Sequence, residues 1–185
     1  MTIKIPEQVT LNTDRLILRP FQFGDVNDMV VMGGFPTWDG SGPPKPYTKQ
    51  HAEKMLAQSI LDSWDTKPSF AIVLNDTVIG KVGMIVNQEY DTAEIGYSLK
   101  EEYWGKGITT EAVRAVVLWA LRDVGLAKVC AQADVRNERS WKLMEKIGMI
   151  REGISRSDHV IHSVRTGMVW YSILREELDN LLLPG

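Results

Sequence analysis

A short segment in the middle of the chain combines glycine, hydroxyl and basic residues in a pattern that suits a bound phosphate. It reads Trp104-Gly105-Lys106-Gly107-Ile108-Thr109-Thr110 and leads directly into a predicted helix. Alternate glycines allow successive backbone N–H groups to point into one concavity, and a helix N-terminus adds about half a positive charge. Lys106, Thr109 and Thr110 could add side-chain donors. The segment predicts an anion site suited to a diphosphate; the alternative is a tight turn between a strand and a helix with no ligand.

The same segment departs from two common nucleotide-binding loops. It lacks the Gly-Lys-Ser/Thr ending of a P-loop, and it lacks the third glycine and the downstream strand acid of a dinucleotide fold. A nucleotide-binding regulator that uses Gly105 and Gly107 is therefore a separate hypothesis, which predicts binding of ATP or NAD. The missing P-loop lysine pattern counts against it.

Hydrophobic periodicity predicts the elements that position this segment. Residues 93–99 alternate with a period of two, as expected for a strand with one buried face. The two faces carry Ala93, Ile95, Tyr97 and Leu99 on one side and Glu94, Gly96 and Ser98 on the other. A helix is predicted over 110–124, because apolar residues recur there every three to four positions. A strand over 128–135 and a helix over 137–147, with Asn137 as its N-cap, follow.

The remaining segments complete a mixed α/β sheet in one domain over residues 1–185. Further helices are predicted over 23–32 and 48–64, and further strands over 15–20, 70–74, 78–86, 149–153 and 164–174. The first part reads as an antiparallel meander, and the second as a strand–helix–strand–helix–strand series. A polar segment from Arg156 to Arg165, which carries His159 and His162, links the last two strands. The proline-rich segment 36–46, with Trp38, is a predicted loop that could face a substrate.

Composition excludes several classes of protein. Apolar residues make up 44% and charged residues 24% of the chain, a balance typical of a folded domain rather than a disordered or fibrous chain. A net charge of −3 lacks the concentrated positive field that nucleic acid binding needs. The three histidines and the single cysteine, Cys130, are too scattered for a structural zinc site, so no metal is predicted. The chain has no apolar run long enough to cross a membrane and no signal-peptide h-region, which predicts a cytoplasmic protein.

Several motifs, in order, resemble one enzyme superfamily. The stretch EIGYSL followed by YWGKGITTEA resembles the acyl-CoA-binding core of the GNAT superfamily of N-acetyltransferases. The later stretch DVRNERSWKLMEKIGM, followed by REG, resembles the second half of that fold. Near the start, TDRLILRPF resembles the branch that contains the ribosomal-protein-alanine (Rim-type) acetyltransferases. The resemblance covers about residues 13–174, and it implies a GNAT-like fold in which a parallel strand pair splays to hold acetyl-CoA.

The resemblance also implies which residues hold acetyl-CoA. The strands 93–99 and 128–135 would splay, and the pantetheine arm would enter the gap and pair with free main-chain groups. The residues implied for cofactor binding are Tyr97, Ser98, Leu99, Trp104, Gly105, Lys106, Gly107, Ile108, Thr109, Thr110 and Asn137. The diphosphate loop of the family opens with Arg or Gln, whereas Glu102 stands at that position here. Backbone amides from Gly105 to Thr110 are therefore expected to carry the diphosphate contact.

Two side chains are candidates for the chemistry of acetyl transfer. A protein amine is mostly ammonium at pH 7, so a base must remove a proton before the amine attacks a thioester. Glu94 is the candidate base; alternatively, it is a surface carboxylate on an edge strand. A backbone N–H on its strand could stabilise the oxyanion. Ser140 matches the family position close to the thioester sulfur and could protonate the leaving thiolate. The thiolate could also leave as an anion. Alternatively, Ser140 is an ordinary residue in the first turn of the helix. Tyr171 is a further candidate donor or a packed tyrosine.

The sequence thus predicts an acetyl-CoA-dependent N-acetyltransferase that works through a ternary complex. The Rim-type resemblance implies that the acceptor is the N-terminal amine of a protein or peptide. A small-molecule amine, such as an amino acid, a polyamine or an antibiotic, is the alternative acceptor. A domain that binds acyl-CoA as a sensor, without catalysis, is an alternative of a different class. A homodimer through the exposed final strand is also a hypothesis.

Overall fold

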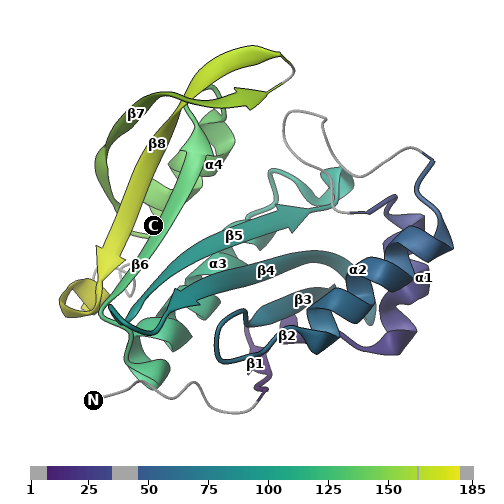
Figure 1. The fold of residues 1–185 in the computed structure, drawn as a ribbon. Helices are drawn as coiled ribbons and strands as arrows, with labels where there is room; N and C mark the ends of the chain where they lie inside the picture. Colours follow the sequence, from purple (N-terminus) through teal and green to yellow (C-terminus); the bar gives the residue numbers. More distant parts are fainter. Residues whose placement is uncertain (1–7, 35–45, 162, 180–185) are drawn as a thin grey trace.

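The computed structural model describes residues 8–34, 46–161 and 163–179. These residues build one sheet of eight strands in the order β1-β2-β3-β4-β5-β6-β8-β7, flanked by helices (Figure 1). The strands are β1 (Leu11–Asn12), β2 (Ile17–Pro20), β3 (Ser69–Leu74), β4 (Thr77–Asn87), β5 (Thr92–Leu99), β6 (Lys128–Asp134), β7 (Ile150–Ile161) and β8 (Val164–Leu174). The helices are α1 (Val26–Val31), α2 (Lys49–Leu61), α3 (Ile108–Leu118) and α4 (Glu138–Lys146). The predicted loop 36–46, with Trp38, lies outside the described residues except for residue 46. His162 also lies outside them.

The predicted mixed sheet is confirmed. Strands β1 to β5 form an antiparallel meander, and β6, β8 and β7 are also antiparallel neighbours. In the described part of the chain, β5 and β6 make the parallel pair, through Thr92–Lys128, Ala93–Val129 and Glu94–Cys130. Beyond that point the two strands diverge (Figure 1). The gap predicted from the family resemblance is therefore present.

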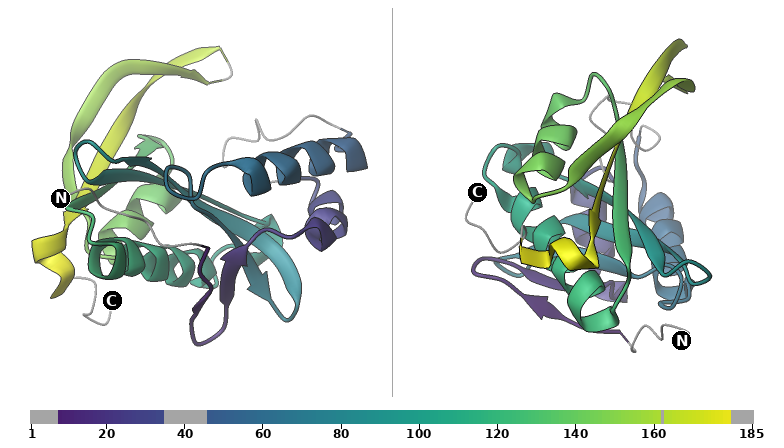
Figure 2. Two further views of the ribbon diagram at one scale, coloured as in Figure 1. Left: turned by 60° about the horizontal axis from the view of Figure 1, so that its bottom comes forward. Right: turned by 90° about the vertical axis from the view of Figure 1, so that its left-hand side faces the viewer.

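Helices cover the two faces of the sheet unequally. The left view of Figure 2 places α3 below the sheet, and α2 above it on the right. The larger core lies under α3 and α4, where Ala93, Ile95 and Leu99 of β5 are buried, as the period-two alternation predicts. A smaller core joins α1 and α2 to β3, through Met29, Ala52, Leu56, Ala71 and Val73. On the α2 side, no helix of the described residues covers the sheet between α2 and the β7–β8 hairpin (Figure 2).

The helix ends are set by local capping groups. The Asn137 side chain accepts a hydrogen bond from the backbone N–H of Ser140, so the predicted N-cap of α4 is confirmed. Gly107 precedes α3 in a left-handed conformation with φ of 74°, and α3 therefore begins at Ile108, two residues before the predicted start. Residues 119–124, predicted as the end of that helix, form a π-helical turn instead. The earlier start places the N-terminus of α3 directly after the glycine segment.

The last two strands correct two expectations. The segment from Arg156 to Arg165 is not a polar link, because β7 continues to Ile161 and pairs with β8 up to Ile161–Val164. The register shifts between Ser155 and His159, where Ser157 has a φ of 55°, and pairing resumes from His159 to Ile161. The hairpin projects from the body of the sheet (Figure 1). The final strand β8 is also not exposed at an edge, since it lies between β6 and β7. A homodimer formed by pairing at an exposed edge of the final strand is thus not available in this topology.

A buried ion pair fixes the chain between β2 and α1. The Arg19 guanidinium donates to both carboxylate oxygens of Asp25 at 2.7 and 2.9 Å, and Asp25 also accepts from the backbone N–H of Gln22 at 2.8 Å. The side chain of Asp25 is only 6% exposed.

Within the described ranges, no helix is both long and apolar enough to span a membrane.

Candidate functional site

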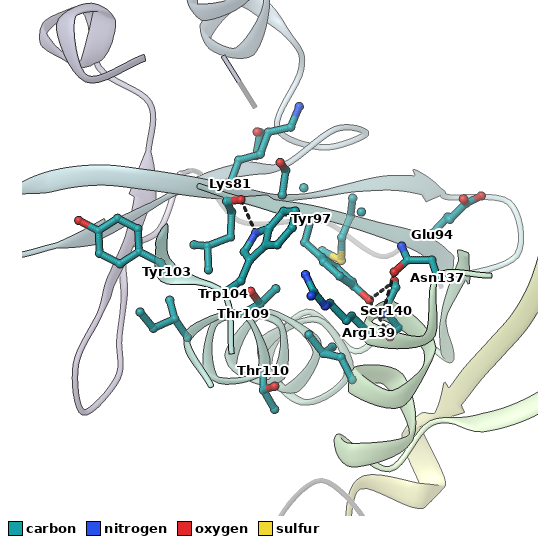
Figure 3. A pocket seen from close by; sticks show the side chains of 18 of the residues that line it. Lys81, Glu94, Tyr97, Tyr103, Trp104, Thr109, Thr110, Asn137, Arg139 and Ser140 are labelled. Atoms are coloured by element: carbon teal, nitrogen blue, oxygen red, sulfur yellow. Dashed lines mark hydrogen bonds between the residues drawn. The ribbon is translucent and has the colours of Figure 1, made fainter. Parts of the chain in front are cut away.

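One cavity of about 1250 Å³ is lined from both faces of the sheet. Its walls come from β5, the start of α3 and α4 on one side, and from α2 and β4 on the other. Figure 3 shows its labelled side chains spread along β5, from Tyr103 at one end to Glu94 at the other. This volume exceeds the usual range of about 300–1,000 Å³ for a single small ligand. The cavity therefore has room for two substrates that meet at β5.

The edge of β5 supplies main-chain groups to this cavity. Because pairing with β6 ends at Glu94–Cys130, the later residues of β5 have β4 along one edge and the gap along the other. Backbone N–H and C=O groups in such a position seek partners, and an amide-bearing ligand can provide them. Tyr97, Ser98 and Leu99, predicted to contact the cofactor, all line the cavity.

The glycine segment forms one end of the cavity. Gly105 and Gly107 have φ values of 75° and 74°, a conformation that glycine adopts without steric cost. The Trp104 indole N–H donates to the carbonyl oxygen of Leu99 at 2.7 Å, which ties this segment to the end of β5. Of the residues predicted here, the cavity lining includes Trp104, Gly105, Gly107, Ile108, Thr109 and Thr110. Lys106 lies outside the lining, with its ammonium 5.4 Å from the ring centroid of Tyr103.

Positive charge reaches this end of the cavity from α4 rather than from the glycine segment. Glu102, which stands where the family has Arg or Gln, pairs with Lys100 at 2.9 Å, and that hydrogen bond lowers the pKa of its carboxyl group. Arg139, Lys142 and Lys146 line the cavity at helical spacings that place them on one side of α4. The Arg139 guanidinium lies 5.2 Å from the ring centroid of Trp104, against the glycine segment.

A hydrogen bond between two hydroxyl groups bridges β5 and α4. Tyr97 Oη lies 2.9 Å from Ser140 Oγ, and it can also donate to the carbonyl oxygen of Ser140 at 3.3 Å (Figure 3). Burial raises the pKa of Tyr97 to about 12, against a smaller lowering by the hydrogen bond with Ser140. The phenol is therefore protonated at neutral pH. Asn137 lines the same part of the cavity.

Glu94 lies at the opposite end of the cavity and has a partner that the sequence did not suggest. Its Oε1 accepts a hydrogen bond from Gln132 Nε2 at 2.8 Å, across the point where β5 and β6 begin to diverge. Gln132 Oε1 is buried and has no hydrogen-bond partner among the described residues. The amide therefore serves Glu94 as a donor, and it leaves the second carboxylate oxygen available to the cavity.

Two other singled-out residues lie outside the cavity lining. Tyr171 is buried in the main core, and its hydroxyl donates to Glu145 at 2.7 Å. Burial, aided by the Glu145 carboxylate, raises the pKa of Tyr171 to about 12. Cys130 is half-buried on β6, and burial followed by the nearby charge of Glu94 raises the pKa of its thiol.

The sequence reasoning missed Gln132 and Arg139. Gln132 is a polar residue in the otherwise largely apolar stretch VCAQA, which could have marked it as a side chain with a specific partner. Arg139 follows the N-cap Asn137 by two positions and gave no local signal. The sequence reasoning also missed the α2 side of the cavity, where Met55, Ser59 and Asp62 form part of the wall.

Comparison with known proteins gives consistent matches. The acetyltransferase (GNAT) domain profile matches residues 15–150. The uncharacterized N-acetyltransferase p20 of Bacillus licheniformis is 28% identical over 173 residues, 91% of this chain and 97% of that protein. The ribosomal protein uS5-alanine N-acetyltransferase of Escherichia coli strain K12 is 25% identical over 91 residues, 44% of this chain and 47% of that protein. The solved structure of the microcin C7 self-immunity acetyltransferase MccE, in complex with acetyl-CoA and AMP, matches with a TM-score of 0.76 at 19% identity, over 88% of this chain and 93% of that one.

Proposed function

The chain belongs to the GNAT family of N-acetyltransferases, and from that premise we propose that it acetylates the N-terminal amine of a protein or peptide. The observation that carries the proposal is the single cavity lined from both faces of the sheet. One side of the cavity suits acetyl-CoA, and the other leaves a separate approach for an acceptor. Direct transfer in a ternary complex requires both substrates to be held together in this way.

The groups on the α3–α4 side fit acetyl-CoA. Backbone N–H groups around Gly105 and Gly107, together with the N-terminus of α3, would hold the diphosphate. Arg139 would supply the positive charge that Glu102 does not. The edge of β5 that faces the gap would pair with the pantetheine amides, and the bound thioester would supply an activated acetyl group.

Glu94 is proposed as the group that takes the proton from the acceptor ammonium, directly or through a water. Gln132 is proposed as the residue that positions it, because it holds Oε1 and leaves Oε2 for the amine. A carboxylate in this position can accept a proton only if its second oxygen reaches the acceptor, so the orientation matters as much as the charge. Main-chain N–H groups of β5 would stabilise negative charge on the acetyl oxygen.

Ser140 is proposed to donate a hydrogen bond to the leaving thiolate, with Tyr97 as the residue that orients it. A serine hydroxyl that accepts from Tyr97 has its own proton free to point at a sulfur. A thiol with a pKa of about 8.5 is a tolerable leaving group as an anion, so a hydrogen bond is sufficient. Asn137 would contact the pantetheine arm beside this pair.

The charges on the acceptor side favour a peptide over a polyamine. The lining on that side combines the acidic Asp62 and Glu94 with the basic Lys67 and Lys81. The two ammonium groups balance the two carboxylates, so this side has no net negative charge to attract a polycation, whereas a peptide N-terminus brings one positive charge and a neutral backbone. The named activity of the Escherichia coli relative, on a ribosomal protein alanine, supports the same class of acceptor.

The first experiment is calorimetric titration with acetyl-CoA, followed by an assay of thiol release. The variant Gly105→Glu should lose micromolar binding, because a carboxylate would occupy the diphosphate position. Gly33→Glu is a matched control: it has a comparable φ of 69° and open space around its Cβ, but it does not line the cavity. Equal binding by both variants would contradict the diphosphate site.

The acceptor is tested with hexapeptides that begin with alanine or serine, and with spermidine. Thiol release with the peptides and none with spermidine would support the proposal. Faster turnover of spermidine would instead assign a small amine as the acceptor. Binding of acetyl-CoA with no turnover of any of these amines would favour a sensor domain.

A further inference from the structure

Two glycines face each other across the sheet on the side that α2 and the β7–β8 hairpin leave open. Gly83 of β4 pairs directly with Gly96 of β5, and both line the cavity. The adjoining pairs on this face are Lys81–Ser98 in one direction and Ile85–Glu94 in the other. The glycine pair is thus a patch of sheet surface without side chains, directly beside Glu94.

Packing does not explain glycine at these two positions. A Cβ added at Gly80 or Gly167 would lie 2.5 or 2.6 Å from a carbonyl oxygen of the neighbouring strand, so close backbone approach requires those glycines. In contrast, a Cβ at Gly96 would meet no heavy atom of the described residues within 4 Å, and one at Gly83 would make an ordinary contact at 3.5 Å. Neither Gly83 nor Gly96 has a positive φ.

A ligand backbone that lies close against the sheet would explain why glycine occurs at positions 83 and 96. Glycine weakens a strand interior, because it loses more conformational freedom on folding and adds no side chain to the packing. Such a glycine often marks a place where a ligand or another backbone approaches closely. No heavy atom of the described residues lies within 4 Å of the position that a Cβ at Gly96 would take, and Gly96 lines the cavity.

We propose that Gly83 and Gly96 form the floor of an acceptor subsite, on which the first residues of a peptide lie extended with their backbone against the sheet. This inference rests on the proposed function. It adds that the missing Cβ atoms, rather than a specific side chain, select an acceptor with a thin, extended leading segment.

The spacing along β5 agrees with this placement. Gly96 follows Glu94 by two residues on the same face, a separation of about 6.6 Å along a strand. An extended peptide advances by about 3.3 Å per residue, so two of its residues span the same distance. An N-terminal amine at Glu94 therefore brings the next two peptide residues over the glycine floor.

Adding side chains to the floor tests the proposal without disturbing the fold. For an alanine-initiated hexapeptide, kcat/KM should fall about tenfold in Gly96→Ala and about a hundredfold in Gly96→Val, as expected for one or two methyl-sized obstructions in a close-fitting site. Gly83→Ala should have an effect similar to that of Gly96→Ala. The Kd for acetyl-CoA, measured by calorimetry, should stay within about twofold of the unmodified protein, since the floor lies on the acceptor side.

Gly153→Ala is the matched control, because Gly153 also lies in a strand with open space at its Cβ but does not line the cavity. It should leave peptide turnover unchanged, and thermal melts should show that all four variants fold.

Two results would overturn the subsite alone: unchanged peptide kinetics in Gly96→Val, or a loss of acetyl-CoA affinity as large as the loss of kcat/KM. If the unmodified protein binds acetyl-CoA but acetylates spermidine and no peptide, the proposed acceptor class fails and the peptide floor fails with it.

Discussion

The contact between Tyr97 and Ser140 allows a sharp test of how the thiolate is stabilised. The two hydroxyl oxygens lie 2.9 Å apart, and burial raises the pKa of Tyr97 to about 12. The substitution Tyr97→Phe keeps the ring and removes only the hydroxyl. It distinguishes a tyrosine that orients Ser140 from a tyrosine that gives its proton to the leaving group.

The size of the expected effect follows from two pKa values. A proton transfer from a phenol with a pKa of about 12 to a thiolate whose acid has a pKa of about 8.5 is uphill by about 5 kcal/mol. That cost makes Tyr97 a poor acid, so we expect it to act through Ser140. Loss of one orienting hydrogen bond corresponds to about 1–1.5 kcal/mol, and kcat should therefore fall about tenfold.

The assay is single-turnover thiol release at saturating acetyl-CoA, across a range of pH. Tyr97→Phe should lower the rate by a similar factor at every pH, and its Kd for acetyl-CoA should not change. Tyr171→Phe is the control, because it removes a comparable buried hydroxyl, bonded to Glu145 at 2.7 Å, outside the cavity lining. Both variants should lose about 1 kcal/mol in free energy of unfolding, but only Tyr97→Phe should slow the reaction.

The reasoning would be refuted by a loss of more than about a thousandfold in rate, a magnitude typical of removing an essential acid rather than a positioning group. The reasoning would equally be refuted if the rate of the unmodified protein falls at high pH and this fall is absent in Tyr97→Phe. Ser140→Ala combined with Tyr97→Phe should cost little more than Ser140→Ala alone, because the tyrosine acts through the serine.

Three further outcomes are expected. Glu94→Gln should lower turnover of a peptide about tenfold at pH 7, where only about a tenth of an α-amine is deprotonated, and the deficit should shrink towards pH 9, where the amine is already deprotonated. Asp25→Ala should lower the free energy of unfolding by about 3 kcal/mol in urea titrations, because it leaves a mostly buried guanidinium unpaired, whereas Asp123→Ala, from an exposed pair, should change it by less than about 0.5 kcal/mol. Because the folded-state pKa of both Tyr97 and Tyr171 is raised to about 12, above that of an unfolded tyrosine, their contribution to stability should be lost as the pH rises from about 10 to 12. Absorbance titration of phenolate, run beside alkaline unfolding, checks this; ionisation of all five tyrosines of the chain near pH 10 without unfolding would contradict it.

The sequence by itself determined the features that depend on neighbouring residues. Alternation in 93–99 assigned the buried and open faces of β5, and the glycines at 105 and 107 marked the strand-to-helix turn that starts α3. Asn137 was identified as a cap from its position alone. These predictions succeeded because backbone sterics, capping and hydrophobic period act within a few residues of the chain.

The ends of the β7–β8 hairpin could not be placed from the sequence. Residues 156–165 are mostly polar, which is typical of a loop, but residues 159–161 pair with residues 164–166 across the hairpin. Pairing with β8 outweighs the weak local preference, as it commonly does in strands. The same tertiary arrangement inserted β8 between β6 and β7 and so removed the final strand from the edge.

Only the tertiary structure decided which side chains meet at the site. Tyr97 and Ser140 are 43 residues apart in the chain, and Glu94 and Gln132 are 38 apart, yet each pair is joined by a hydrogen bond. No local pattern encodes such a contact, because it depends on where β5 and β6 stop pairing and on how α4 packs behind them. The open floor at Gly83 and Gly96 has the same origin: the sequence contains the two glycines, but only the strand register puts them opposite each other.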